Sequence, residues 1–153
     1  MRVVNVYTGQ LYVTSFDNPL GKVVDITVKT GLRYLAPNWD FLMEYKNSKQ
    51  THEDMLTYMD KYYDKLEHTF TYFKQQLDIL LQNETIILGC YCHEGKFCHR
   101  HLLLYPLRDY ALSKNIRLNY LGEISRKGIV PPSSQDSPMF HSEFLGEVLG
   151  KRK

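Results

Sequence analysis

Short apolar runs alternate with longer segments of helical spacing along most of the chain. The runs consist mostly of valine, isoleucine and leucine, which is typical of parallel strands that are buried on both faces of a sheet. The expected strands are residues 3–7, 23–27, 84–90 and 116–121. Strands that alternate with helices predict an α/β fold, a single three-layer domain with a mostly parallel sheet flanked by helices.

Helical segments are predicted between these strands. Thr51 and Asp54 match a capping box, in which a hydroxyl three residues before an acidic side chain starts a helix. Thr69 is the expected cap of a second helix, with an apolar face made by Phe70, Phe73, Leu77, Leu80 and Leu81. A third helix is expected over residues 98–114, where Pro106 either kinks the helix or moves its start further along the chain.

The chain changes character after Gly128. Proline and serine dominate residues 131–138, which is the composition of a linker. We therefore expect one α/β domain over residues 1–128 and a Pro/Ser-rich linker with a C-terminal tail over residues 129–153. The apolar residues within 140–149 are candidates to dock on the domain or on a partner, and a homodimer stays open.

The composition argues against several classes of protein. The formal net charge of +2 is too small for a general nucleic-acid coat. No apolar run has the length of a membrane span and no signal peptide opens the chain, so we expect no membrane contact. The three cysteines are clustered between Cys90 and Cys98, which does not fit a disulfide framework and indicates a reducing, cytoplasmic location.

The segment from Cys90 to His101 is dense in reactive side chains. A strand ends there, a glycine-containing loop follows, and a helix begins, so free N–H groups and the positive end of the helix dipole favour an anion. Arg100 adds a planar fork suited to phosphate, and Lys96 adds a second positive charge. Cys98, at the predicted helix start, is expected to have a lowered pKa and to be partly thiolate.

Three interpretations of this segment stay open. The first is a pocket for an anion or a nucleotide phosphate, and the second is a metal site made by Cys90, Cys92, Cys98 and neighbouring histidines. The third is structural, with buried thiols and with histidines that cap a helix. Structural zinc sites usually show paired Cys-x2-Cys knuckles, which this spacing lacks. We therefore expect no bound metal and no cofactor.

At these residues the sequence resembles the YeaO-like family, also known as domain of unknown function 488. The family signature is an apolar strand that ends in cysteine, then a short loop, then a Cys-His-Arg element that opens a helix. Cys90 and residues 98–100 match this signature, and Val24 and Asp25 match the start of an early Asp-Val-Arg strand end. The resemblance extends over residues 3–121 and implies an α/β fold with its site at this segment, while the family has no settled activity.

Two positions depart from the family pattern. Cys92 stands where the family usually has a glutamate, so a general acid or base role for that carboxylate does not transfer. Thr27 stands where an arginine follows Asp-Val, and Lys29 or Arg33 could replace its charge. The segments 25–27, 36–39 and 90–92 together resemble the variant form carried by bacteriophages and mobile elements.

We expect the protein to bind a nucleotide or a nucleotide-derived anion in a crevice beyond the carboxyl ends of the strands. Asp25 and Cys90 would lie at the same edge of the sheet, where Asp25 would hydrogen-bond a ribose or act as a base. Tyr34 and Trp39 would supply stacking walls. The other expected ligand contacts are Cys90, Cys92, Lys96 and Arg100.

Two main functional classes follow from this expectation, and a metal-dependent regulator is a third and weaker one. One is a binding protein, for example a phage protein that sequesters a host immune nucleotide signal in the host cytoplasm. The other is an enzyme of hydrolase or glycosyl-transfer type that acts on a nucleoside, nucleotide or base, with Cys98, His99 or Asp25 as catalyst. Arg100 has its own alternative, in which it is a structural brace paired with Asp25 or Glu94.

Overall fold

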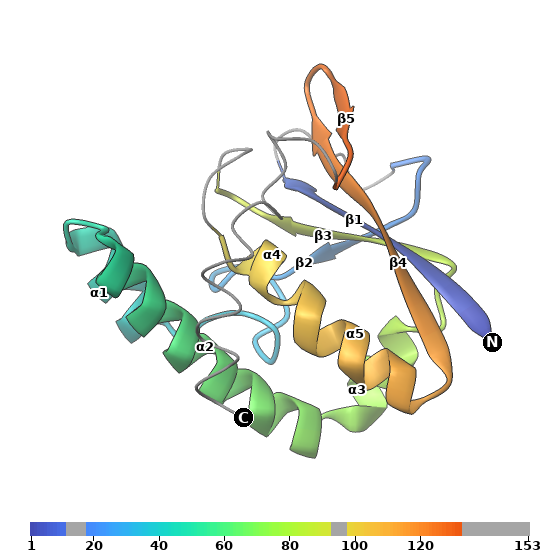
Figure 1. Ribbon diagram of the computed structural model, residues 1–153, viewed down its shortest axis with the longest axis horizontal. Helices are drawn as coiled ribbons and strands as arrows, with labels where there is room; N and C mark the ends of the chain where they lie inside the picture. Colours follow the sequence, from blue (N-terminus) through green and yellow to red (C-terminus); the bar gives the residue numbers. More distant parts are fainter. Residues whose placement is uncertain (12–17, 93–97, 133–153) are drawn as a thin grey trace.

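A five-stranded sheet forms the centre of the computed structural model, which describes residues 1–11, 18–92 and 98–132. The sheet order is β2-β3-β1-β4-β5, with β1 in the middle (Figure 1). The strands β1 to β4 run parallel and β5 runs antiparallel to β4, so the expected mostly parallel α/β sheet is confirmed. The strands are β1 (Arg2–Gln10), β2 (Lys22–Asp25), β3 (Thr85–Cys90), β4 (Ile116–Ser125) and β5 (Gly128–Val130).

The strand β5 continues past residue 128, where the domain was expected to end, and the tail from residue 133 lies outside the described residues. In the part of the chain that the structure describes, no helix has the length and apolar character needed to cross a membrane.

The helices α1 (Trp39–Asn47), α2 (His52–Tyr72) and α3 (Lys74–Leu80) connect β2 to β3. The predicted capping box opens α2, because Thr51 Oγ1 accepts from the Asp54 N–H and Asp54 accepts from the Thr51 N–H. The prediction that Thr69 caps a second helix is wrong. Thr69 lies inside α2 and is buried, and its hydroxyl donates to the Tyr34 carbonyl oxygen at 2.6 Å. The hydroxyl that the local sequence pattern assigned to a helix cap therefore forms a hydrogen bond to a distant segment of the chain.

The segment expected as one helix over residues 98–114 forms two, α4 (His99–Leu102) and α5 (Leu104–Ser113). The break falls at Leu103 and not at Pro106, which is the third residue of α5. The first N–H groups of a helix have no partner within it, so a proline in the first turn removes no hydrogen bond. Of the two outcomes that Pro106 predicted, the later helix start is the one observed.

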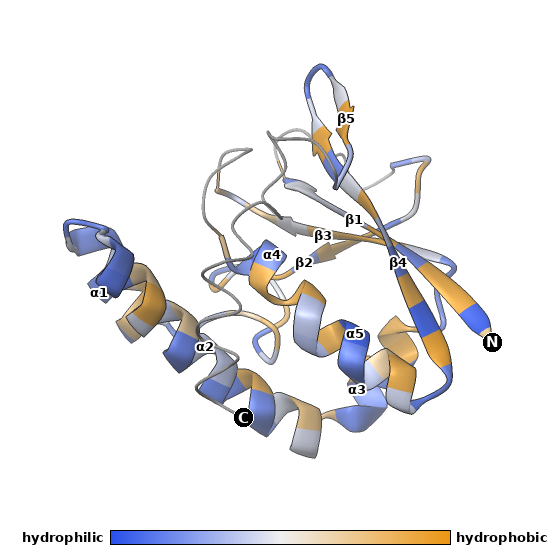
Figure 2. Ribbon diagram, in the orientation of Figure 1, coloured by the Kyte–Doolittle hydropathy of each residue, from blue (hydrophilic) through white to orange (hydrophobic). Residues whose placement is uncertain are grey.

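The described helices pack on one face of the sheet, which differs from the predicted three layers (Figure 1). Their buried side chains join one cluster with Val4, Val6, Ile86 and Leu88. The smaller cluster on the other face is formed by Leu11, Val23, Ile87, Ile124 and the partly buried Tyr7, which are strand and loop residues. The first half of β4 alternates hydrophobic and hydrophilic residues, as a strand with one exposed face does (Figure 2).

The sheet order gives a physical reason for this arrangement. The connections from β2 to β3 and from β3 to β4 advance in the same direction across the sheet. Crossovers between parallel strands are almost always right-handed, so two crossovers that advance in the same direction place their helices on the same face. The alternation of strands and helices along the chain does not reveal the order of the strands in the sheet. The sequence pattern therefore could not show whether helices cover one face of the sheet or both.

Candidate functional site

Asp25 and Cys90 are the last residues of the adjacent parallel strands β2 and β3, and Asp25 is in register with Gly89. The prediction that both lie at the same edge of the sheet is therefore confirmed. The side chain of Asp25 is engaged within its own loop, where it accepts from the Thr27 N–H at 2.9 Å and from the Thr30 hydroxyl at 2.5 Å. Asp25 thus orders the loop after β2.

A cleft of about 790 Å³ opens at this edge of the sheet. The loop after β2, α1 and α2 form its walls, and the residues after β3 with the start of α4 contribute thiols and an imidazole. The predicted site residues Trp39, Cys90, Cys92, Cys98 and His99 all line it. The full lining is Thr27, Val28, Lys29, Trp39, Leu42, Tyr45, Lys46, Gln50, Met55, Tyr58, Cys90, Tyr91, Cys92, Cys98 and His99.

Three predicted site residues, Asp25, Tyr34 and Arg100, do not line the cleft, and one cannot be placed. Asp25 is not among the lining residues. Tyr34, expected as a stacking wall, instead stacks on Phe73 with ring centroids 5.7 Å apart and an angle of 7° between the rings. Lys96 lies outside the described residues. Sequence reasoning missed Lys46, whose position at the end of α1 brings a second lysine to the cleft with Lys29.

One wall of the cleft presents an aromatic ring beside positive charge. Trp39, at the first turn of α1, is 49% exposed, which is high for so large an apolar side chain. The Lys29 ammonium lies 5.4 Å from the centroid of its ring, within the range of a cation–π contact. Lys46, in the last turn of α1, lines the same cleft. This wall therefore suits a flat ring that carries negative charge.

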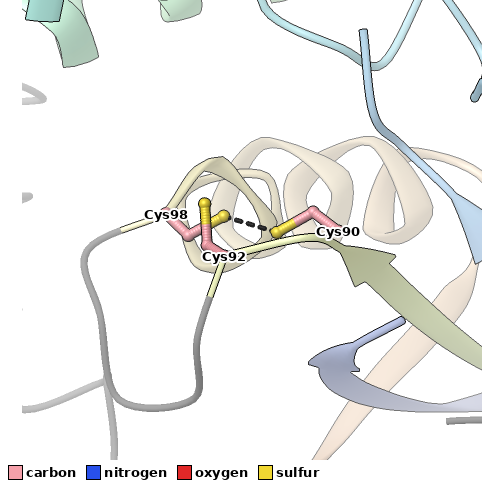
Figure 3. Close-up of side chains that lie close together, drawn as sticks. All are labelled: Cys90, Cys92 and Cys98. Atoms are coloured by element: carbon pink, nitrogen blue, oxygen red, sulfur yellow. Dashed lines mark hydrogen bonds between the residues drawn. The ribbon is translucent and has the colours of Figure 1, made fainter. Parts of the chain in front are cut away.

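Three thiols lie together beside the cleft (Figure 3). The Sγ atoms of Cys90, Cys92 and Cys98 are all within 4.8 Å of one another, and those of Cys90 and Cys98 are 2.6 Å apart. Cys90 ends β3, Cys92 follows in the next loop, and Cys98 immediately precedes α4. The fold therefore brings together three thiols whose spacing along the chain lacks the paired Cys-x2-Cys knuckles of a structural zinc site.

Burial controls the protonation of this cluster. Removal from water raises the pKa of Cys98 to about 12 and that of Cys90 to about 11. The prediction of a lowered pKa at Cys98 is therefore wrong. The prediction rested on the helix start alone, whereas Cys98 is 3% exposed and precedes a helix of only four residues.

His99 is held in one tautomer by the backbone. Its Nε2 lies 2.7 Å from the Ile26 carbonyl oxygen, which can only accept, so Nε2 carries the proton. The lone pair is then on Nδ1, which lies 3.5 Å from the Cys98 Sγ. Burial lowers the pKa of the imidazole to about 3, so at neutral pH His99 is an uncharged acceptor at Nδ1.

Arg100 lies beneath the thiols, is fully buried, and does not line the cleft. Its Nε and Nη2 donate to the two carboxylate oxygens of Glu123 at 2.8 and 3.3 Å. Its Nη1 donates to the Cys90 Sγ at 2.8 Å and to the Cys92 carbonyl oxygen at 3.0 Å. The structural alternative for Arg100 thus fits its placement, with Glu123 as partner in place of Asp25 or Glu94.

Glu123 is the buried acid that sequence analysis missed. It lies in β4 opposite Thr8 of β1, and its Oε1 also lies 2.7 Å from the Nε2 of His101. Burial raises the pKa of this carboxyl, but the hydrogen bonds from His101 and Arg100 outweigh it and hold the pKa well below its usual range. An acidic residue between Gly122 and Ile124, next to an apolar strand, was the signal in the sequence for a charge with a buried partner.

The fold and the site define a class: a mostly parallel α/β domain with a thiol-lined cleft at the carboxyl edge of its sheet. Residues 19–111 match a family model described as the active DUF488-N3 subclade, DUF488-N3a. The match covers more than half of the chain, so the protein belongs to the DUF488 family, and the resemblance to the YeaO-like family is confirmed. No curated protein and no solved structure matches the chain.

Proposed function

We propose that the cleft binds a nucleotide-class ligand, with a flat base against Trp39 and an anionic group near Lys29 and Lys46. The observation that carries this proposal is the half-exposed Trp39 ring on the cleft wall with the Lys29 ammonium 5.4 Å from its centroid. A base stacks on an aromatic ring whatever its hydrogen-bonding pattern, with about 1–3 kcal/mol gained per base. The lysines attract the negative charge of phosphate groups without needing a fixed geometry.

The size and place of the cleft support this proposal. A volume of about 790 Å³ lies within the range of small-ligand sites, which is roughly 300–1,000 Å³. Ligands of parallel α/β sheets bind beyond the carboxyl ends of the strands, which is where β2 and β3 end. The proposal assigns the anion to the lysines of the cleft, because Arg100 is already bound to Glu123.

Binding without turnover fits the chemistry of the cleft best. The raised pKa values of Cys90 and Cys98 leave these thiols protonated at neutral pH, and a protonated thiol is a poor nucleophile. We therefore propose a protein that sequesters its ligand. The resemblance to the phage-borne variant form supports a phage protein that removes a host immune nucleotide signal in the host cytoplasm.

A second candidate is an enzyme that acts on a nucleoside, nucleotide or base. It is favoured by the description of the matched family model as an active subclade. In that case Nδ1 of His99, which carries the lone pair, is the best-placed general base among the described residues of the cleft.

Thermal shift with a panel of mononucleotides, dinucleotides and cyclic nucleotides tests the proposal, followed by calorimetry on each hit. The expected result is a raised melting temperature with at least one nucleotide and no rise with ribose 5-phosphate, which lacks the base. Mass spectrometry of the recovered ligand separates the candidates, because an unchanged ligand supports sequestration and a cleaved ligand supports the enzyme. No nucleotide hit in the panel would contradict the proposed function.

A further inference from the structure

We propose that Cys90, Cys92, Cys98 and His99 form a binding site for one thiophilic divalent cation of the zinc type, where these residues meet the cleft. The three sulfur atoms come from the end of β3, the loop after it and the residue before α4. This inference goes beyond the proposed nucleotide binding and does not depend on it, because the ion would be held by the thiols and His99 and the nucleotide by Trp39, Lys29 and Lys46.

The positions of the sulfur atoms suit one shared ion. All three lie within 4.8 Å of one another (Figure 3). Zinc binds thiolates at about 2.3 Å in a tetrahedral arrangement, which separates the sulfur atoms by roughly 3.8 Å. Because Cys90 and Cys98 are 2.6 Å apart, their Sγ atoms would move apart by about an ångström to hold the ion, a change that side-chain rotation can supply.

The tautomer of His99 supplies the fourth ligand. Metal-bound histidines usually donate their other ring N–H to a carbonyl or carboxylate, which orients the ring. His99 already shows this pattern, since Nε2 donates to the Ile26 carbonyl at 2.7 Å and the lone pair on Nδ1 faces the Cys98 Sγ at 3.5 Å. A sulfur and a nitrogen that share a tetrahedral zinc ion lie about 3.5 Å apart.

The surroundings of the sulfur atoms suit a negatively charged metal–thiolate centre. Three thiolates and a divalent cation carry one net negative charge. The Arg100 guanidinium lies 2.8 Å from the Cys90 Sγ and is fixed from its other side by Glu123, so it can donate to a bound thiolate without moving. Cys90, Cys92, Cys98 and His99 all line the cleft, which provides an entry path for the ion.

This geometry removes the reason for expecting no metal. The expectation rested on the absence of Cys-x2-Cys knuckles, in which one tight turn places two ligands. Here the ligands come from two separate elements, because the end of β3 lies beside the start of α4. Ligand spacing in the sequence is then set by the loop between the elements and carries no metal signature.

Titration of the reduced full-length protein with Co²⁺ alone tests the proposal. The expected result is one Co²⁺ per chain, with the sulfur-to-cobalt charge-transfer bands and intense visible bands of a tetrahedral thiolate site, and their loss on addition of Zn²⁺. Cys98→Ser and His99→Gln should each weaken Co²⁺ binding by more than about tenfold, since loss of a residue that only hydrogen-bonds a metal ligand already costs about 10- to 100-fold. The control variant His68→Gln changes an exposed histidine of α2 and should bind as the wild type does.

A second measurement covers the case in which the cysteine variants fail to fold. In the zinc-loaded wild type, all three thiols should resist a thiol reagent, and a chelator under denaturing conditions should release all three. Absence of thiolate bands in the reduced wild-type protein would overturn the metal site. If the reduced protein fails to bind Co²⁺ and then forms a Cys90–Cys98 disulfide on exposure to air, the metal site would be overturned in favour of a redox pair. Co²⁺ binding that is unchanged in His99→Gln would overturn the four-ligand set.

Discussion

The guanidinium of Arg100 and the carboxylate of Glu123 form a two-point ion pair, with nitrogen–oxygen distances of 2.8 and 3.3 Å, inside the protein. The two side chains are 0% and 2% exposed and join α4 to β4 across the core. A buried charge that loses its partner keeps its desolvation penalty, so such pairs are sensitive to changes on either side. The pair connects the start of the cleft helix to a strand beyond the matched family region of residues 19–111.

Loss of either partner should therefore lower the stability of the fold. Glu123→Gln and Arg100→Ala are each expected to reduce the free energy of unfolding by about 3–5 kcal/mol, the usual loss on breaking a buried pair. Urea denaturation of both variants measures this loss. The control Lys61→Ala breaks the exposed pair with Glu44 and should change the free energy by less than about 1 kcal/mol. Equal losses in the buried and exposed variants would show that Arg100 is not a brace.

The carboxyl of Glu123 should also make stability depend on pH in the acid range. Its folded-state pKa is lowered from the ordinary value of 4.5, so the unfolded chain takes up the proton first as the pH falls. The contribution is fully present above pH 4.5 and is lost as the pH falls below that value toward the folded-state pKa. Urea midpoints measured across this range should decline more steeply in the wild type than in Glu123→Gln. Parallel declines in the two proteins would contradict the lowered pKa, and Glu44→Gln serves as the exposed control.

The loop after β2 depends on a glycine. A side-chain Cβ at Gly31 would lie within about 2.6 Å of the Asp25 carbonyl oxygen and the Thr27 backbone nitrogen, which cannot move without disturbing the strand end. Gly31→Ala is expected to lower stability by about 1–3 kcal/mol, as overpacked positions do. It should also weaken nucleotide binding, because Lys29 lies in this loop. Calorimetry and urea denaturation of the same variant measure both effects, and wild-type values for both would contradict the loop's role.

The four parallel strands were predictable from the sequence, because short apolar runs that alternate with helical segments show in local periodicity, whereas α1 and β5 were not predicted. The start of α2 was also predictable, since Thr51 and Asp54 satisfy each other within one turn. The predictions that failed concern features set by distant parts of the chain. The Thr69 hydroxyl donates to the Tyr34 carbonyl oxygen, and the helices share one face of the sheet because of the strand order. The sequence predicted several residues that line the cleft, among them Trp39, Cys92 and His99, but it did not predict what each residue does there.

Roles within the site depend on burial, which the sequence pattern does not give. Arg100 and Lys46 are both positive, and only the fold places Arg100 in the core and Lys46 in the cleft. The helix start suggested a reactive Cys98, whereas its depth raises the pKa to about 12. Glu123 was overlooked because its partners, Arg100 and His101, lie more than twenty residues away in the chain.

Two residues on the cleft walls should determine ligand affinity. Trp39→Ala removes the stacking surface and is expected to weaken binding of a nucleotide hit by about 5- to 150-fold, from 1–3 kcal/mol per stacked base. Lys46→Ala should weaken it by a smaller factor that shrinks as salt is added, since exposed charges are screened. Calorimetry at low and high salt measures both. The controls Tyr72→Ala and Lys74→Ala change exposed residues outside the cleft lining and should leave affinity unchanged.

The fluorescence of Trp39 is the most direct measurement of the central claim, because the chain has a single tryptophan and it lines the cleft. Titration with a nucleotide hit should change its emission in a saturable way, with a dissociation constant equal to the calorimetric one. Ribose 5-phosphate should leave the emission unchanged. Saturable nucleotide binding by calorimetry with no change in Trp39 emission would place the ligand elsewhere and contradict the account.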